Sequence, residues 1–503
     1  MNERSTTLSE VEAEIGMQDP LHEDESVSRA DYTAIDHFSH FLGLAVSQFY
    51  LLCTAVTLYE VIMRYVFHAP TQWAFEVVMT LCASAWMLSA GFVTLKRRHI
   101  AITVFHIMAP PRIRWGLDLF AMLVGVTALF LLLSDAVVRA YDSVDMVERA
   151  GSSFNSPMPM VLKSMLAAGA TIYLAQLLMN LHRHVGAGLP QLLVKLLAAA
   201  IFIYLGAATL THYVGADTIF GQLSGFFTSV GEALNPADAL DARSYDLGTI
   251  CVIMVAILIA LMMTGMPLGI VTLIVSVLFA IAFFGPGGLY LVSSNATGLL
   301  EHYSLVAVPL FVLMASILER AGIAEDLFDA MSIFAGNLRG GVAVQTTVVA
   351  VILAAMSGVM GGEIVMLGLV ALPQMLRLGY DRKITIGLIC ASGALATLIP
   401  PSIIMIVYGL SADVAIGDLF MAGAVPGLLL ATFYAGYVLI RCNLNPALAP
   451  TAAEVAERTG DHSLPKERML AVILCVLLIA CVMGSIYGGV ASVTEAAGVG
   501  VFG

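Results

Sequence analysis

Apolar residues occur in long, nearly unbroken runs along most of this chain. A run of about 17–25 such residues is long enough to cross a bilayer as a helix. The pattern predicts five spans in the first part of the chain, near residues 41–63, 73–95, 115–137, 158–181 and 190–214. A hydrophilic stretch at 217–246 follows them and predicts a linker that joins two units.

The second unit is predicted to contain further spans near 247–265, 268–284, 304–319, 416–440 and 469–487, with a shorter apolar piece at 289–300. Two other apolar regions of this unit are interrupted. Residues 341–356 and 364–376 flank a Gly-rich break at Ser357–Gly362, and residues 384–399 and 402–412 flank Pro400-Pro401. Unpaired backbone groups cost several kcal/mol each in hydrocarbon, so such breaks are tolerated mainly where they line a site. Interrupted helices are the best sequence indication of ion and substrate sites in secondary transporters.

The composition supports a polytopic, all-α membrane protein. Hydrophobic residues make up 59% of the 503 residues and charged residues only 12%, whereas soluble proteins carry about 25% charged residues. The mean hydropathy is +0.91. The net charge of −13 and the absence of a basic stripe exclude nucleic acid as an expected partner and leave the lipid bilayer.

The charged loops predict an orientation. Five basic residues crowd the loop after the second span without an acid between them, namely Lys96, Arg97, Arg98, Arg112 and Arg114. Acids dominate the loop after the third span and the 217–246 linker, so the positive-inside rule places the N-terminus in the cytoplasm and the linker outside. Residues 341–376 must then form a re-entrant hairpin that enters and leaves on one side. Residues 1–30 lack the basic region of a signal peptide and are predicted to be a disordered acidic tail.

The two interrupted regions supply candidate ligands for sodium. Sodium is a hard cation that binds several oxygen atoms, and broken helices offer them as backbone carbonyls at negatively polarised helix ends. Tandem proline removes two donors and releases upstream carbonyls. The candidate sodium ligands are therefore Ser357, Gly358, Ile399 and Pro401, at two breaks that can face one another. The alternative is a kinked helix that only packs. A transition-metal site is not expected.

Glu363 is an acid inside an apolar segment, which makes it a functional candidate by default. It is either a cation ligand, a proton relay, or a cap stabilised by the helix dipole. Glu495 raises the same question. Each glutamate follows small residues and a hydroxyl at the start of an apolar run, a pattern that an inverted repeat predicts.

Other features favour a transporter over an enzyme. Glu60 and Arg64 are four residues apart and are expected to pair on one helix face. The histidines lie at span ends, where an interfacial position is favoured over metal binding. The chain contains no nucleotide-binding or catalytic motif. An ion gradient is then the expected energy source, with no other cofactor.

At these residues the chain resembles a tripartite ATP-independent periplasmic (TRAP) transporter whose two membrane subunits are fused. Residues 30–185 resemble the small subunit through Arg64-Tyr65-Val66-Phe67, Trp73-Ala74-Phe75-Glu76 and Arg98-His99-Ile100. Residues 245–503 resemble the start of the large subunit. The motifs there include Gly265-Met266-Pro267, Met356-Ser357-Gly358, Leu378-Gly379-Tyr380, Leu398-Ile399-Pro400-Pro401-Ser402-Ile403 and Gly484-Ser485-Ile486-Tyr487-Gly488-Gly489.

The resemblance implies an elevator-type importer of the bacterial inner membrane, with inverted repeats and two re-entrant hairpins. It divides the chain into the tail at 1–30, a four-helix small-subunit domain at 31–185, a connecting helix and external linker at 186–246, and a permease domain at 247–503. A periplasmic binding protein would deliver an organic acid, such as a dicarboxylate, and sodium symport would drive uptake. Carried over, the four candidate ligands form the first sodium site. Ser402 lies near the substrate, and Ser492 and Thr494 lie at the tip of the second hairpin.

Three departures from the family pattern bear on this expectation. Val359 replaces a frequent serine and Ala396 a frequent glycine, changes that backbone carbonyls would survive. The chain is also expected to end within the second hairpin. Two alternative functions therefore remain: a truncated, non-transporting scaffold or regulator, and an elevator transporter that works without a binding protein.

Overall fold

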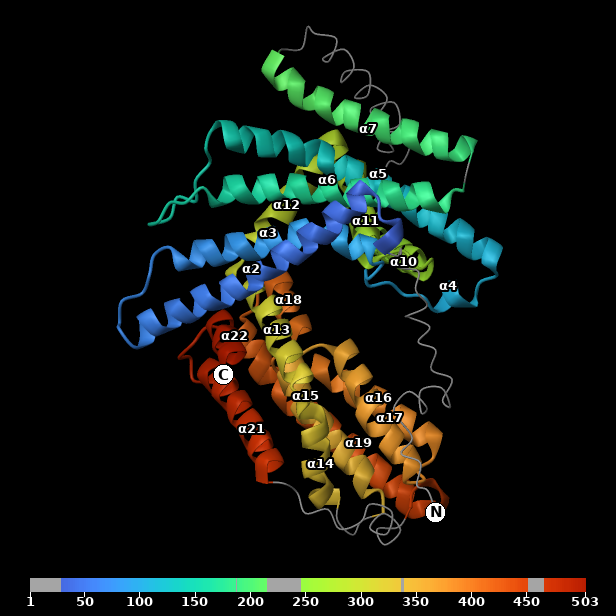
Figure 1. Cartoon of the computed structure of the whole chain (residues 1–503), viewed down its shortest axis with the longest axis vertical. Helices are drawn as coiled ribbons and strands as arrows, with labels where there is room; N and C mark the ends of the chain where they lie inside the picture. The colour runs from blue at the N-terminus through green and yellow to red at the C-terminus, as the bar shows by residue number, and fades with distance from the viewer. Residues whose placement is uncertain (1–28, 187, 215–245, 336–338, 451–465) are drawn as a thin grey trace. The chain divides into compact units, whose positions relative to one another are not determined.

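The structure, a computed structural model, describes residues 29–186, 188–214, 246–335, 339–450 and 466–503 (Figure 1). Within these residues every regular element is a helix. The predicted acidic tail lies outside the described residues except for its last two positions, and so does the 217–246 linker except for Asp246.

The helices follow one another in the order expected from the apolar runs. The first part of the chain forms α2 (Ala34–Tyr65), α3 (Ala74–Leu95), the short α4 (Val104–Met108), α5 (Pro111–Asp145), α6 (Met158–His184) and α7 (Leu189–Val214). The second part forms α10 (Leu247–Met263), α11 (Leu268–Phe284), α12 (Gly288–Leu300), α13 (Ala307–Arg320), α14 (Ile323–Ala335), α15 (Gly341–Ser357), α16 (Met360–Arg377), α17 (Arg382–Gly393), α18 (Ile403–Ala412), α19 (Ile416–Leu444), α21 (Lys466–Tyr487) and α22 (Val493–Phe502).

Among the described residues, seven helical segments are long and apolar enough to cross a membrane. They are Ala34–Tyr65, Ala74–Leu95, Pro111–Asp145, Met158–His184, Leu189–Gly206, Tyr303–Arg320 and Ile416–Leu444. Several shorter apolar helices of 10–17 residues accompany them, including Gly341–Ser357 before the first predicted break and Ile403–Ala412 after the second. The prediction of an all-helical protein with many membrane spans is confirmed.

Two features of the helices were not predicted. The 35 residues of α5 extend for about 52 Å, well beyond a hydrocarbon core of about 30 Å, so its ends reach the polar regions. The other feature is α14, which contains Glu325, Asp326 and Asp329. A search for long apolar spans does not find such a short amphipathic helix. Leu327 and Phe328 on its apolar face are buried.

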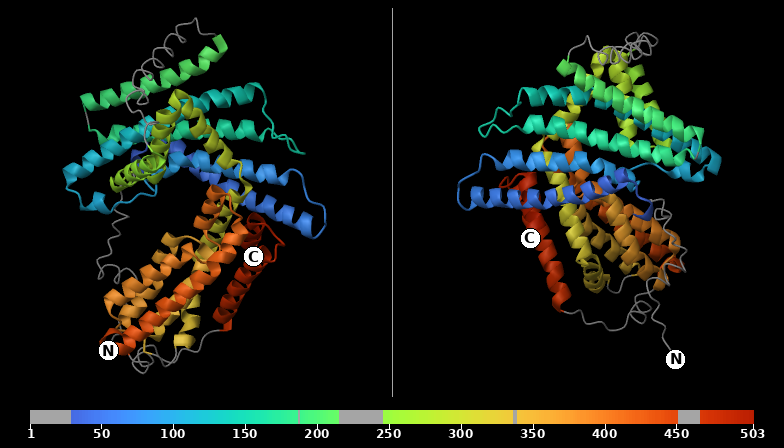
Figure 2. Two further views of the ribbon diagram at one scale, coloured as in Figure 1. Left: turned by 180° about the vertical axis from the view of Figure 1, so that it is seen from behind. Right: turned by 45° about the horizontal axis from the view of Figure 1, so that its top comes forward.

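The chain forms two compact units. One unit contains Met79–Glu301 and the described part of Asp19–Leu51. In it, α5 and α6 run alongside one another (Figures 1 and 2) and share an apolar core with α7 and α11. Gly169 of α6 lies against the Met87 carbonyl oxygen of α3, where a larger side chain would collide with backbone.

A polar network inside this unit fixes the start of α2 to α6. Asp36 is fully buried and accepts hydrogen bonds from the Thr33 backbone at 2.8 Å and from Gln176 Nε2 at 2.8 Å. Arg183 donates to both Asp36 carboxylate oxygens, at 3.1 Å to Oδ1. Gln176 also accepts a hydrogen bond from Ser39 at 2.8 Å. The buried charge of Asp36 is therefore fully compensated.

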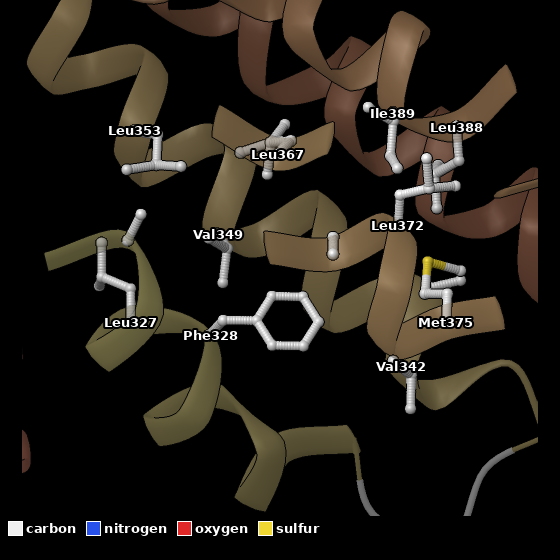
Figure 3. Packing of buried hydrophobic residues seen from close by; sticks show 14 of the residues in the cluster. Leu327, Phe328, Val342, Val349, Leu353, Leu367, Leu372, Met375, Leu388 and Ile389 are labelled. Carbon is white, nitrogen blue, oxygen red and sulfur yellow. The ribbon is translucent and has the colours of Figure 1, made fainter. Parts of the chain in front are cut away.

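The other unit contains Leu52–Val78 and His302–Gly503. Its helices from α13 to α19, yellow to orange in Figures 1 and 2, lie side by side. Figure 3 shows side chains from α14, α15, α16 and α17 meeting in the largest apolar cluster. This packing holds both interrupted regions in one place.

We expect Asp36→Asn to lower the free energy of unfolding by about 3 kcal/mol, because it leaves the Arg183 guanidinium without its counter-charge. Thermal unfolding in detergent measures this. Asp31→Asn, at an exposed position of the preceding turn, is the control and should change stability by less than about 0.5 kcal/mol. Equal melting temperatures for the two variants would contradict the role assigned to the network.

Candidate functional site

The first interrupted region is a helical hairpin with a very short turn. Helix α15 ends at Ser357 because Gly358 adopts a left-handed conformation, with φ +58°, which glycine tolerates without strain. The Gly358 N–H donates to the Ala354 carbonyl at 3.2 Å, and Ser357 Oγ accepts from the Val359 N–H at 3.4 Å. Helix α16 then starts at Met360. We call Ser357–Val359 the hairpin turn.

The second interrupted region lies between α17 and α18. Helix α17 tightens into a 3₁₀ turn at Ala394–Thr397, and the chain is then non-helical until α18 begins at Ile403. We call Leu398–Ser402 the Pro-Pro break. The carbonyl oxygens of Ile399, Pro400 and Pro401 accept no hydrogen bond from the part of the chain that the structure describes. The tandem prolines thus leave a group of unpaired oxygen atoms.

The structure brings these two regions into contact. The Ile403 N–H donates to the Gly358 carbonyl at 3.4 Å. A β-carbon added to Gly358 would collide with the Pro401 carbonyl oxygen, which would lie only 2.4 Å from it. The Ser402 Cα would lie 3.4 Å from that β-carbon. Ile399 is buried in one apolar cluster with Ala354 of α15. The four predicted sodium ligands therefore lie in or beside one junction, although their binding of sodium stays a prediction.

Ser402 and Ala396 complete the surroundings of the Pro-Pro break. Ser402 is fully buried, and its hydroxyl donates to the Thr397 carbonyl at 3.0 Å. The hydroxyl proton is used in this hydrogen bond, so the Ser402 oxygen can act only as an acceptor toward a ligand. Ala396 is also fully buried and packs in the cluster around Ile399. Ala396 is therefore accommodated by packing.

Glu363 lies one turn into α16, close to the hairpin turn. It is 1% exposed, and neither carboxylate oxygen has a hydrogen-bond partner. Its backbone N–H donates to the Val359 carbonyl at 3.3 Å. No side chain caps α16 by a hydrogen bond, so Glu363 does not act as a hydrogen-bonding cap. Its roles as a cation ligand, a proton relay or a cap stabilised by the helix dipole stay predictions.

The second predicted hairpin tip has different surroundings. Ser492 caps α22: its Oγ accepts from the Glu495 N–H at 3.3 Å, and its own N–H donates to Glu495 Oε2 at 2.8 Å. The Thr494 hydroxyl donates to the Tyr303 carbonyl at 3.3 Å. Glu495 is therefore a cap, which answers for this residue the question raised by the sequence.

Glu495 also has a partner that sequence reasoning missed. Arg64 Nη1 of α2 lies 2.9 Å from Glu495 Oε1, and the Tyr65 hydroxyl donates to Glu495 Oε2 at 3.3 Å. The predicted pairing of Arg64 with Glu60 is confirmed, at 2.7 Å. The contact with Glu495 was not predictable because 431 residues of sequence separate the partners.

The protein offers mainly backbone oxygens as ligands. Within the described residues no group of three or more His, Cys, Asp or Glu side chains could hold a metal ion. Helix ends with partial negative charge and helix ends with partial positive charge meet at the junction. The carboxyl ends of α15 and of the 3₁₀ turn after α17 favour a cation, whereas the amino ends of α16 and α18 favour an anion.

Two family models match the chain over separate ranges. The model for tripartite ATP-independent periplasmic transporters, DctQ component, matches residues 53–187. The model for the tripartite ATP-independent periplasmic transporter, DctM component, matches residues 255–503. The chain belongs to the TRAP transporter family. It is a fused DctQ–DctM membrane component, and the family consists of permeases and not of enzymes. The resemblance inferred from the sequence motifs is thereby confirmed.

Curated relatives of this TRAP permease match its DctM part. The C4-dicarboxylate TRAP transporter large permease protein DctM of Pseudomonas aeruginosa is 35% identical over 201 residues, which are 40% of this chain and 45% of that protein. The ectoine TRAP transporter large permease protein TeaC of Halomonas elongata is 34% identical over 246 residues, 49% of this chain and 56% of that protein. The isethionate TRAP transporter permease protein DctMQ of Oleidesulfovibrio alaskensis is 28% identical over 211 residues, 40% of this chain and 31% of that protein. The chain thus spans about half the length of the large permeases that it matches.

Gly358→Ala is expected to destabilise the TRAP permease by at least about 1–2 kcal/mol, from the left-handed backbone alone. Its β-carbon would also push the Pro-Pro break away. Gly361→Ala is the matched control, since a β-carbon there meets nothing within 4 Å. In a helix this change is neutral or stabilising by up to about 1 kcal/mol. Melting temperatures in detergent measure both, and shifts of the same sign would contradict the close approach at Gly358.

Proposed function

We propose that this chain is the membrane component of a sodium-coupled, binding-protein-dependent importer of organic acids. One observation carries the proposal: the hairpin turn and the Pro-Pro break contact each other where three carbonyl oxygens accept no hydrogen bond from the described residues. Such oxygens suit a hard cation. The absence of a nucleotide-binding motif in the sequence is consistent with an ion gradient as the energy source.

The first sodium ion would be held at the junction by Ser357, Gly358, Ile399 and Pro401. Ser357 contributes a hydroxyl, and the other three contribute carbonyl oxygens at the ends of broken helices. A bound sodium ion would also neutralise the partial negative charge that gathers at these carboxyl ends. Ser492 and Thr494 would belong to a second site, at the tip of the second hairpin.

The substrate would bind beside this sodium ion. The amino ends of α16 and α18 follow directly on the hairpin turn and the Pro-Pro break, so their N–H groups can bind an acidic group. Ser402, at the start of α18, would add a hydroxyl oxygen. The substrates for which these relatives are named, a C4-dicarboxylate, ectoine and isethionate, all carry a carboxylate or sulfonate. We therefore propose an organic acid, delivered by a periplasmic binding protein.

Transport would follow an elevator mechanism in the bacterial inner membrane. In this proposal α15 and α16 are a re-entrant hairpin of a mobile unit within residues 247–503, and the four-helix domain at 31–185 extends the fixed scaffold. The connecting helix and linker at 186–246 join the two. The N-terminus would lie in the cytoplasm, and the basic loop between α3 and α5 supports this orientation.

The test is uptake by the complete permease in proteoliposomes, with its binding protein and an inward sodium gradient. We expect accumulation of the acid in sodium and little or none when potassium replaces sodium at equal ionic strength. Omitting the binding protein should abolish uptake too. Equal uptake in both salts would contradict the proposed sodium coupling. Uptake without the binding protein would favour the alternative of an elevator transporter that works without one.

A further inference from the structure

Glu363 differs from every well-paired acid described above. Its side chain is buried, with 1% exposure, and neither oxygen has a hydrogen-bond partner. Asp36 and Glu495 are equally buried, but each is held by an arginine and by hydrogen bonds. A buried carboxylate that has neither is strongly disfavoured in its ionised form.

A small cavity adjoins Glu363, with room for about one water molecule. Side chains from α13, α14, α15 and α16 line it, most of them apolar, including Leu318, Ile323, Leu353, Met356 and Met366. Two further lining residues are polar. Ser357 belongs to the hairpin turn, and Glu319 is exposed in the last turn of α13. The cavity therefore has a polar edge at one end of a membrane-spanning helix.

No cationic side chain is among the described residues that line the cavity beside Glu363. Among the residues lining the cavity, Glu319 is the one other titratable group. Arg377 is at the far end of α16, 14 residues or about 20 Å away. Helix α17 approaches Glu363 with its carboxyl end, where Gly393 contacts Ile364. Its two basic residues, Arg382 and Lys383, are at the opposite end of that helix.

The remaining neighbours do not supply a counter-charge either. Helix α15 and the 3₁₀ turn after α17 contain no acidic or basic side chain. Asp326 of α14 has an interaction partner of its own, and Arg320 of α13 is exposed. Cys390 of α17 is exposed as well. No described side chain therefore compensates the charge of Glu363, and the amino end of α16 offers only a partial positive charge.

The cavity beside Glu363 offers enough oxygen atoms to bind a proton but too few to bind sodium. A hard metal cation needs several oxygen ligands, but the lining offers only the Glu363 carboxyl, the Ser357 hydroxyl and the exposed Glu319. A proton needs one oxygen atom. We propose that Glu363 is a proton-binding site of the first hairpin, reached through the cavity edge at Glu319.

This site makes the hairpin sensitive to pH. With its proton bound, α16 carries no net charge near the hairpin turn and can remain buried among α13, α14 and α15. Loss of the proton requires the cavity to open to water, because the packed arrangement cannot compensate the charge. The inference does not rest on the proposed sodium-coupled import and is tested without transport.

The test compares melting temperatures of the full chain with those of Glu363→Gln between about pH 5 and pH 8, in potassium salts. An unfolded glutamate loses its proton near pH 4.3, about its ordinary value, whereas folded Glu363 keeps it. The folded state therefore binds more protons, so the wild-type protein loses stability relative to Glu363→Gln as the pH rises. We expect the advantage of Glu363→Gln to grow by at least about 2 °C over this range.

Asp31→Asn is the control, because it removes an exposed carboxyl that does not line this cavity, and it should leave the pH dependence of melting unchanged. Infrared spectroscopy gives a second readout that does not need a stable variant. At pH 7 the wild-type protein should retain the carbonyl band of a protonated carboxylic acid, and Glu363→Gln should lack that band.

Two outcomes would overturn the proposal. One is the absence of both the protonated-acid band and the pH-dependent difference in melting. The other is a sodium-specific rise in the melting temperature that Glu363→Gln abolishes while Gly361→Ala retains it. The second outcome would make Glu363 a sodium ligand.

Discussion

The organisation of this permease depends on one constraint: a helix that is interrupted inside a membrane must find partners for the backbone groups that the interruption exposes. The two interrupted regions meet this constraint partly through each other. The Ile403 N–H bonds to the Gly358 carbonyl, and this contact requires the absence of a side chain at Gly358. The packing of α14, α15, α16, α17 and α19 then holds the pair in place.

The backbone carbonyl oxygens that stay unpaired at this junction indicate what it can bind. The tandem prolines cannot donate hydrogen bonds, so the junction has an excess of carbonyl oxygens. Helix ends of opposite polarity converge there. One short stretch of backbone can thus attract a cation and an acidic group together, which is the chemistry that ion-coupled uptake of an organic acid requires.

Much of this fold was predictable because apolar run length directly reports membrane helices. The two interrupted regions were predictable from glycine and proline, whose backbone restrictions do not depend on tertiary context. The sequence could not distinguish Glu363 from Glu495, since both follow small residues at the start of an apolar helix. The difference between them comes from Arg64 and Tyr65, which lie far away in the chain, and α14 was missed because its apolar face is short.

The most direct measurement is the melting temperature of the purified full chain in sodium and in potassium at equal ionic strength. A ligand that binds only the folded state stabilises it by mass action, and the transported acid need not be known. A site assembled at Gly358 and the Pro-Pro break predicts a higher melting temperature in sodium. Identical melting temperatures at sodium concentrations up to saturating levels would contradict it.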